Sequence, residues 1–156
     1  MTATVFVDAS VLLHARDASE GEKQARAMEW MTHLWYTKTG RLSFQVLEEF
    51  YLTVTHRLDP GLTPPQAQDE VRDLLTWRPI PFDRQVLEGA WSLADLHELS
   101  FWDATVVAAA QAGGCRFLLT EAFEHGREFG AVEVVNPFDE EGGPRFVHEK
   151  YSEVKR

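Results

Sequence analysis

The feature that most constrains the fold of this chain is an alternation of short and long apolar patterns. Four short segments rich in β-branched and aromatic residues have the length of buried strands: 4–10 (TVFVDAS), 41–45 (RLSFQ), 115–121 (CRFLLTE) and 131–137 (AVEVVNP). Longer segments with helical spacing of apolar residues lie between them. Alternating strands and helices predict an α/β fold, with a central parallel sheet of about four to five strands flanked by helices on both faces.

The expected helices carry start and stop signals. They cover residues 20–37, 46–58, 64 onward, 83–99 and 101–113. Thr63 followed by Pro64 is a strong pair of N-cap and first helical residue. Ser100 is expected to cap the last of these helices, and Gly40 to end the first. The five tryptophans recur among other apolar residues at helical spacing, which favours a place in the core.

Composition and the chain ends narrow the function class. No apolar run approaches the roughly 20 residues that a membrane helix needs, and the first segment lacks the basic start of a signal peptide. The single cysteine, Cys115, excludes an internal disulfide and a cysteine-rich metal site and fits a reducing cytoplasm. The net charge of −10 argues against a general nucleic-acid-binding surface, but it permits an acidic site that meets phosphate through a divalent metal. Residues 139–156 are polar and charged, so we expect a domain over residues 1–138 followed by a loosely attached polar extension.

Four acidic side chains fall at positions that a parallel sheet brings together. Asp8 ends the first predicted strand, and Glu121 ends the third. Asp103 lies on the first turn of the helix that leads into the third strand, and Glu49 lies on the helix after the second. Ligands of such sheets bind beyond the carboxyl ends of the strands, so we expect these acids to share one edge. Clustered carboxylates stay ionised only beside a cation, and oxygen-only ligands select a hard one such as Mg²⁺ or Mn²⁺.

Each of these acids also has a purely structural interpretation. Asp8 would cap the next helix, Asp103 would complement a helix dipole, and Glu121 would be a solvated acid after a strand. Ser10 would cap a helix or orient Asp8 and a water on the metal, and the two roles are compatible. The six histidines form no zinc-type pair on a helix, and the glycines form no phosphate-binding loop.

Three segments in the same order resemble the PIN-domain family, specifically its VapC-type ribonuclease toxins. The segment VFVDASVLL resembles the opening strand of the family. LSFQVLEEFYLTVTHRL resembles its S-x-Q-V-L-x-E-F-Y segment, and LSFWDATVVAAAQAGGCRFLLTE resembles its S-F-W-D-A helix with the strand behind it. The resemblance covers about residues 5–138 and aligns the acid of the family with Glu49 rather than with the neighbouring Glu48.

The resemblance implies a metal-dependent endoribonuclease that a partner antitoxin holds inactive. The catalytic residues, which would also hold Mg²⁺ or Mn²⁺, would be four acids: Asp8, Glu49, Asp103 and Glu121. The metal would activate water for attack on an RNA phosphodiester, while Ser10 and Thr120 would position water or a carboxylate. A homodimer is also implied.

One position departs from the pattern of the family. Where family members often carry a further aspartate after the last strand of the pattern, this chain has Ala122. Either Glu121 or Glu124 substitutes for it, or the fourth ligand is missing and metal binding is weaker. The alternative to a nuclease is therefore a catalytically impaired PIN-fold binding module. An aspartyl phosphotransferase is disfavoured for two reasons. One class of these enzymes needs a second aspartate at the position where this chain has Ser10. The other class needs a lysine near the end of the sheet, and no lysine lies within residues 39–149.

Overall fold

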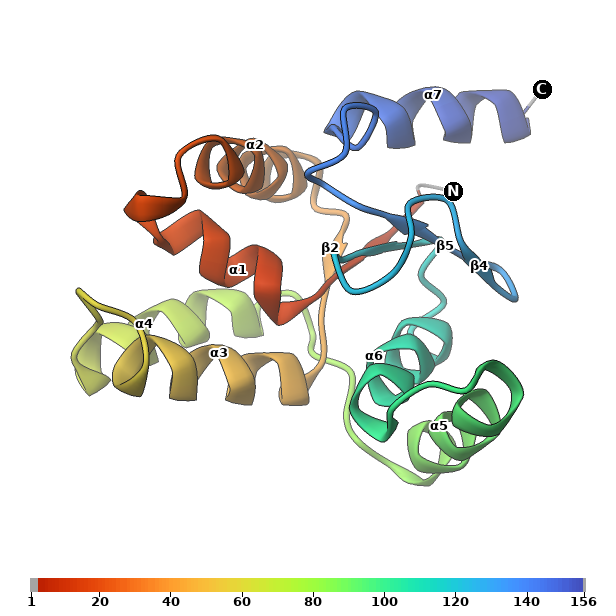
Figure 1. Ribbon diagram of the computed structural model, residues 1–156, viewed down its shortest axis with the longest axis horizontal. Coiled ribbons are helices and arrows are strands. Elements are labelled where there is room, and N and C mark those ends of the chain that lie inside the picture. The colour runs from red at the N-terminus through yellow and green to blue at the C-terminus, as the bar shows by residue number, and fades with distance from the viewer. Residues whose placement is uncertain (1–2, 156) are drawn as a thin grey trace.

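The centre of the molecule is a sheet with strand order β2-β1-β3-β5-β4 (Figure 1). The computed structural model describes residues 3–155, and the side chains of residues 3–150. The strands are β1 (Val5–Val7), β2 (Gly40–Arg41), β3 (Phe117–Leu119), β4 (Glu128–Phe129) and β5 (Val132–Val135). All pairs are parallel except β4 with β5, which is antiparallel. The predicted α/β class with a mainly parallel sheet is confirmed.

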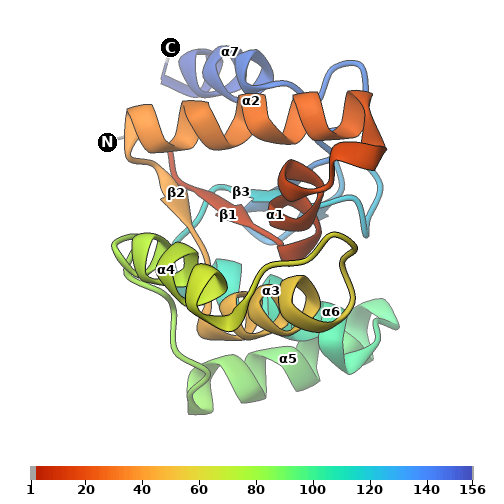
Figure 2. The same ribbon diagram turned by 90° about the vertical axis from the view of Figure 1, so that its left-hand side faces the viewer.

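Helices cover both faces of this sheet. In the described part of the chain they are α1 (Ala9–Arg16), α2 (Glu22–Thr37), α3 (Phe44–His56), α4 (Pro64–Leu75), α5 (Arg84–His97), α6 (Phe101–Ala112) and α7 (Pro144–Lys155). A 3₁₀ turn at Ala18–Glu20 separates α1 from α2. The helices α2 and α7 lie on one side of the sheet, and α3, α5 and α6 lie on the other (Figures 1 and 2).

Side-chain caps explain where the helices begin. The Gln66 N–H donates to Thr63 Oγ1 at 3.4 Å, and the Thr63 N–H donates back to Gln66 Oε1 at 3.0 Å. The Asp103 N–H donates to Ser100 Oγ at 3.1 Å, which starts α6. Each such cap satisfies an otherwise unpaired amide and contributes about 1 kcal/mol to helix stability. The predicted caps Thr63 and Ser100 are confirmed.

Several local predictions were wrong. The helix α1 was not predicted; it begins directly after β1 because Asp8 caps it. The second strand is shorter than predicted, because the Val46 N–H donates to Ser43 Oγ at 3.2 Å and starts α3 early. The strand β4 was also not predicted. The helix α2 ends with Lys38 in the left-handed conformation, and Gly40 lies in β2 instead.

The tryptophans divide into a buried and an exposed group, so their predicted place in the core is only partly right. Trp30 and Trp77 are buried. The others are exposed by 41%, 53% and 44% of their surface: Trp35, Trp91 and Trp102. Helical spacing groups residues on one face, but only the packing of neighbouring helices decides how much of that face is covered.

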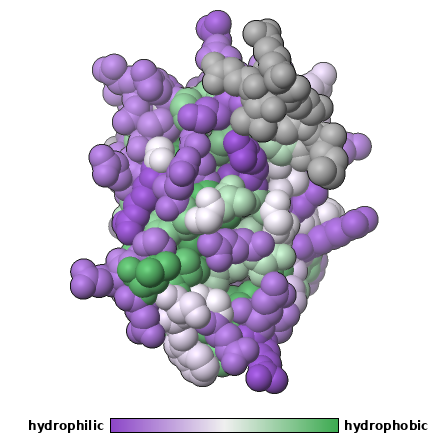
Figure 3. Space-filling view, turned by 90° about the vertical axis from the view of Figure 1, so that its right-hand side faces the viewer, coloured by the Kyte–Doolittle hydropathy of each residue, from purple (hydrophilic) through white to green (hydrophobic). Residues whose placement is uncertain are grey.

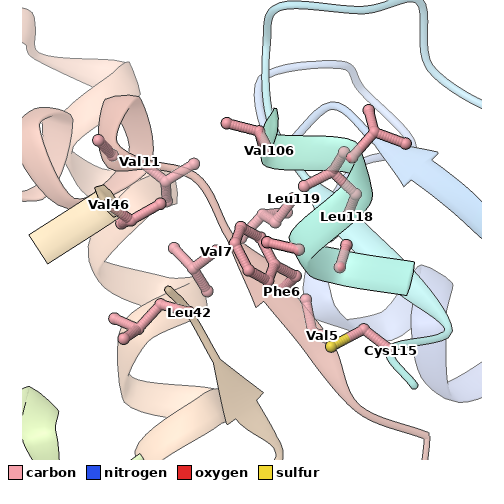
Figure 4. Packing of buried hydrophobic residues seen from close by; sticks show 14 of the residues in the cluster. Val5, Phe6, Val7, Val11, Leu42, Val46, Val106, Cys115, Leu118 and Leu119 are labelled. Carbon is pink, nitrogen blue, oxygen red and sulfur yellow. The ribbon is translucent and has the colours of Figure 1, made fainter. Parts of the chain in front are cut away.

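The core aligns the carboxyl ends of β1 and β3. Val7 and Leu119 are fully buried and are partners in the parallel register of these strands. In Figure 4, Val11 and Val46 lie on one side of Val7 and Leu119 lies on the other. Tight packing of this kind leaves little freedom for a shift of one strand against the other. The residues that follow each strand are therefore held close together.

The segment after position 138 contacts the rest of the chain through a loop and the helix α7. Val147 is buried, Lys150 Nζ lies 3.7 Å from Glu133 Oε1, and the Trp30 indole N–H donates to the Gly142 carbonyl at 2.6 Å. The division into a domain over residues 1–138 and an extension stays a prediction. Among the described residues, no helix has both the length and the apolar character to cross a membrane. From the side of β4 and α5, the surface is mainly hydrophilic with a hydrophobic patch in its lower half (Figure 3).

Candidate active site

Asp8 and Thr120 meet at the carboxyl ends of β1 and β3. Thr120 Oγ1 donates to Asp8 Oδ2 at 2.8 Å, and the Ala9 N–H donates to Asp8 Oδ1 at 2.7 Å. Thr120 Oγ1 in turn accepts from the Ala122 N–H at 3.0 Å. The capping role considered for Asp8 is confirmed, and the same bonds fix the orientation of its carboxylate.

Two further carboxylates, Glu49 of α3 and Asp103 of α6, are coupled electrostatically to Asp8. The charge of Asp8 raises the pKa of Glu49, and the charge of Asp103 raises the pKa of both. Three elements that are far apart in sequence thus contribute one acid each. We call Asp8, Glu49 and Asp103 the acid cluster.

Glu121 lies near this cluster but in a different electrostatic setting. Its Oε1 is 2.6 Å from His14 Nε2, and its Oε2 is 3.0 Å from Lys23 Nζ. The interpretation of Glu121 as a freely solvated acid is therefore wrong. His14 and Lys23 did not emerge from sequence reasoning; the available signal was that His14 lies on the helix that Asp8 caps.

The pKa shifts separate the acid cluster from Glu121. Burial raises the pKa of Asp8, and Asp103 and Glu121 add to this, while hydrogen bonds from Thr120 and Ala9 only partly oppose it. Burial, followed by the charge of Asp8, raises the pKa of Glu49 against a hydrogen bond from the Trp102 side chain. Burial would also raise the pKa of Glu121, but hydrogen bonds from His14 and Lys23 outweigh it, so the net shift is downward. Negative charge is compensated at Glu121 and left uncompensated at Asp8.

Ser10 adds a polar group whose hydrogen-bonding capacity is unused. Its Oγ is buried and has no hydrogen-bond partner among the described residues. Because Asp8 occupies the N-cap of α1, the capping interpretation of Ser10 is wrong. Buried hydroxyl groups nearly always have a partner, so one supplied from outside the protein chain is expected at this position.

The acid cluster fits a hard divalent cation by its chemistry. Its donors are oxygens only, its charges repel one another, and Ser10 offers an unused hydroxyl. Among residues 3–150, no three His, Cys, Asp or Glu side chains converge closely enough to enclose a metal ion by themselves. Mg²⁺ usually keeps several waters and takes only one or two carboxylates directly, so a loose set of three acids suits it.

The upward pKa shifts predict how the metal-free protein responds to pH. A folded state that binds protons more tightly than the unfolded state loses stability as pH rises. We therefore expect the melting temperature to fall as pH rises. The fall due to Asp8 starts at its ordinary pKa of 3.8 and that due to Glu49 at its ordinary pKa of 4.5, and each continues through the raised pKa of the group. Glu121 acts oppositely: its contribution is present above 4.5 and is lost as pH falls through its lowered pKa.

Melting curves in EDTA from pH 4.5 upward would measure this response. The Asp8→Asn protein should show a flatter decline than the parent over the same range, since one of the two responsible groups no longer titrates. Parallel declines in the two proteins would contradict the assigned burial and repulsion at Asp8.

The chain is similar to a known protein family and to several solved structures. The family model described as PIN domain matches residues 5–122. A toxin–antitoxin complex from Klebsiella pneumoniae has a similar structure, with a TM-score of 0.62 at 18% identity over 86% of this chain and 98% of that chain. No curated protein sequence matches this chain significantly.

Two further solved structures share the fold. One is Mycobacterium tuberculosis VapC20, described as a toxin that cleaves the sarcin–ricin loop, with a TM-score of 0.57 at 20% identity over 83% of this chain and 99% of that chain. The other is VapBC2 from Rickettsia felis bound to a promoter DNA fragment, with a TM-score of 0.56 at 14% identity over 84% of this chain and 96% of that chain. At such identities the likeness demonstrates the fold alone.

Proposed function

This chain belongs to the PIN-domain family, and on that basis we propose that it is a metal-dependent endoribonuclease of the VapC type, the toxin of a toxin–antitoxin pair. The observation that carries the proposal is the uncompensated charge at Asp8. Its pKa is raised by burial and by neighbouring carboxylates, although Asp8 lies at the carboxyl edge of a parallel sheet, where ligands of such folds bind. A protein gains nothing in stability from buried, repelling acids, which points to a cation as their purpose.

Each residue of the site then has a role that follows from its contacts. When bound, Mg²⁺ or Mn²⁺ would lower the pKa of an attacking water and stabilise the leaving oxygen of an RNA phosphodiester. The residues that would hold it are those of the acid cluster. Thr120 keeps the Asp8 carboxylate in one orientation through its hydroxyl, and Ser10 offers a hydroxyl to water at the site.

Glu121 has a more distant place in this proposal. Both of its oxygens already have partners, His14 and the Lys23 ammonium, so it would join the metal directly only after leaving them. We place it as an outer acid that holds these two side chains beside the acid cluster. Its charge also contributes to the raised pKa of Asp8.

The proposed partners and location follow from the same family membership. RNA is the proposed substrate, a cognate antitoxin the proposed inhibitor, a homodimer the proposed assembly and the cytoplasm the proposed compartment. One of the similar structures is described as a toxin–antitoxin complex and another as a toxin that cleaves the sarcin–ricin loop, which supports the choice of these partners. An acidic site without its metal attracts a guanidinium, so the inhibiting antitoxin segment is proposed to carry arginine.

The direct test is cleavage of a fluorescently labelled single-stranded RNA by the purified protein. We expect cleavage with Mn²⁺ or Mg²⁺ and none in EDTA, followed on a denaturing gel. Cleavage that persists in EDTA would contradict a metal-dependent reaction. Absence of cleavage on a panel of structured and unstructured RNAs, together with tight binding of Mn²⁺ by calorimetry, would favour the impaired binding module instead.

Ala122 decides between the complete and the impaired site. It is exposed, and its amide bonds to the hydroxyl that orients Asp8, so an acid placed there lies at the border of the acid cluster. We expect Ala122→Asp to tighten Mn²⁺ binding by about 10- to 100-fold, as judged from the usual effect of groups around a metal site. It should also lower the melting temperature of the metal-free protein, because a further carboxylate adds repulsion.

Calorimetry with Mn²⁺ and melting curves in EDTA measure the two effects of Ala122→Asp. The matched comparison is Glu121→Gln. If Ala122→Asp leaves the Mn²⁺ affinity unchanged while Glu121→Gln abolishes binding, Glu121 already fills the fourth place and its outer position in our proposal is wrong.

A further inference from the structure

A pocket lies at the opposite end of the sheet from the acid cluster. It has a volume of about 390 Å³ and is lined by six residues: Trp35, Lys38, Arg41, Thr76, Trp77 and Arg78. They come from the C-terminal end of α2, from β2 and from the segment after α4, which lie on the same side of the molecule in Figure 2. The strand β2 begins here, whereas Asp8 follows the end of the parallel strand β1. We call this the cationic pocket.

The charge of the cationic pocket is positive although the whole chain carries −10. Lys38, Arg41 and Arg78 contribute three positive charges, and no carboxylate lines the cavity. Among the described residues, none of the three forms an ion pair, whereas seven other lysines and arginines do. The C-terminal ends of α2 and α4 each add about half a negative charge, and Asp73 lines the adjoining hollow beside Trp35 and Thr76, so the three cations still leave the cavity positive.

Two aromatic rings form the apolar part of the cationic pocket. Trp35 and Trp77 pack with ring centroids 5.0 Å apart and an interplanar angle of 56°. Trp77 is buried against Gly40, where a Cβ atom would lie only 2.5 Å from the indole, so the glycine is what allows this ring to form the floor. Trp35 keeps 41% of its surface exposed and so offers a flat apolar surface next to the three cations.

Two of these cations follow the ends of helices and have left-handed backbone conformations. Among described residues other than glycine, only Lys38, Arg78 and Glu98 have positive φ, with values of 60°, 55° and 54°. Two of the three thus line one cavity. Arg41 is held by hydrogen bonds from its Nη1 to the carbonyls of Gly40 at 2.7 Å and Lys38 at 3.3 Å. Lys38 is the left-handed C-cap of α2, and Arg78 follows the end of α4, so the ends of these two helices place both side chains at the cavity.

We propose that the cationic pocket binds a nucleotide, with its base against Trp35 and its phosphate among Lys38, Arg41 and Arg78. Aromatic rings and cations side by side suit the two halves of a nucleotide, because bases stack on aromatic faces and arginine binds phosphate through paired donors. The volume also lies in the range of small-ligand sites. The chemistry is shared by a free nucleotide and by one nucleotide of a single-stranded RNA. The site stands apart from the proposed cleavage reaction and needs no metal.

Binding is measured with ADP and with a five-nucleotide single-stranded RNA, each titrated in EDTA so that cleavage does not interfere. Tryptophan fluorescence and calorimetry report the dissociation constant. We expect Arg78→Gln to weaken binding of both probes about tenfold or more, since charged hydrogen bonds to phosphate are the strong ones. Trp35→Leu should weaken binding to a similar degree, because base stacking on an aromatic ring is of comparable strength.

Arg84→Gln is the matched control, because it removes the same charge from an exposed position on α5 outside the pocket. It should bind like the parent, and melting curves should show all variants folded. Tighter binding of ADP than of the RNA assigns the site to free nucleotides, and the reverse order assigns it to RNA. Inorganic phosphate that competes as well as ADP would overturn the role of the base. Binding of a short acidic peptide with no binding of either nucleotide probe would overturn the proposal in favour of a protein partner.

Discussion

Asp8→Asn is expected to produce a folded protein that cleaves RNA at least on the order of a hundredfold more slowly than the parent. The substitution keeps the size of the side chain and leaves an oxygen that can accept a hydrogen bond from the Ala9 amide. The cap of α1 is therefore retained. What it removes is one of the three negative charges of the acid cluster, and with it a large part of the attraction for a divalent cation.

The same variant should be more stable than the parent when metal is absent. Burial and the charges of Asp103 and Glu121 all oppose ionisation of Asp8, so a neutral amide avoids a cost that the parent carries near neutral pH. Melting curves in EDTA and in Mn²⁺ measure this directly. We expect Mn²⁺ to raise the melting temperature of the parent strongly and that of Asp8→Asn little, because only a cation bound to the folded state stabilises it.

Asp95→Asn provides the control for the Asp8 experiment. Asp95 is exposed on α5, and the substitution removes one charge in the same way. It should cleave RNA like the parent and respond to Mn²⁺ like the parent. A well-folded Asp8→Asn protein with full metal-dependent cleavage would remove Asp8 from the reaction altogether.

Glu49→Gln should abolish cleavage, whereas Glu48→Gln should leave it nearly unchanged. Consecutive helical residues point about 100° apart, so one of this pair faces the strand ends and the other does not. Glu49 is half-buried, its pKa is raised by burial and by Asp8, and it accepts a hydrogen bond from Trp102, while Glu48 is exposed. The two variants differ from the parent by the same chemical change at adjacent positions.

Single-turnover cleavage at saturating and at limiting Mn²⁺ distinguishes two causes of a loss at Glu49. If excess Mn²⁺ restores cleavage, Glu49 contributes to metal affinity; if it does not, Glu49 acts on the reacting water or substrate. Full activity of Glu49→Gln together with loss in Glu48→Gln would mean that the other face of α3 serves the site.

Trp102 shows how a residue assigned to the core by its spacing takes part in the site instead. It lies on the first turn of α6, one residue before Asp103, and its side chain bonds to Glu49 of α3 while 44% of its surface is exposed. The bond joins the two helices whose acids face Asp8. Periodicity alone gives no information on such a contact, because it depends on how two separate helices approach each other.

The sequence by itself determined the fold class and the positions of the acids along it. The alternation of strand-length and helix-length patterns implied the parallel sheet, and the acid after VFV was placed at a strand end because β-branched runs end where polar residues begin. The caps Thr63 and Ser100 were readable for the same reason: their effect is local, between residues three apart in the chain.

Only the tertiary structure decided which acids are compensated by a cation. Asp8 and Glu121 look alike in sequence, each an acid at or beyond the end of a strand, yet Glu121 pairs with His14 and Lys23 and Asp8 meets Thr120 and other carboxylates. The bonds of Glu121 to His14 and Lys23 and of Asp8 to Thr120 join residues that are 98 to 112 positions apart along the chain. Electrostatic interactions depend on distance in space and on burial, and neither is encoded in local spacing, so the pairing that separates the acid cluster from Glu121 appears only once the chain has folded.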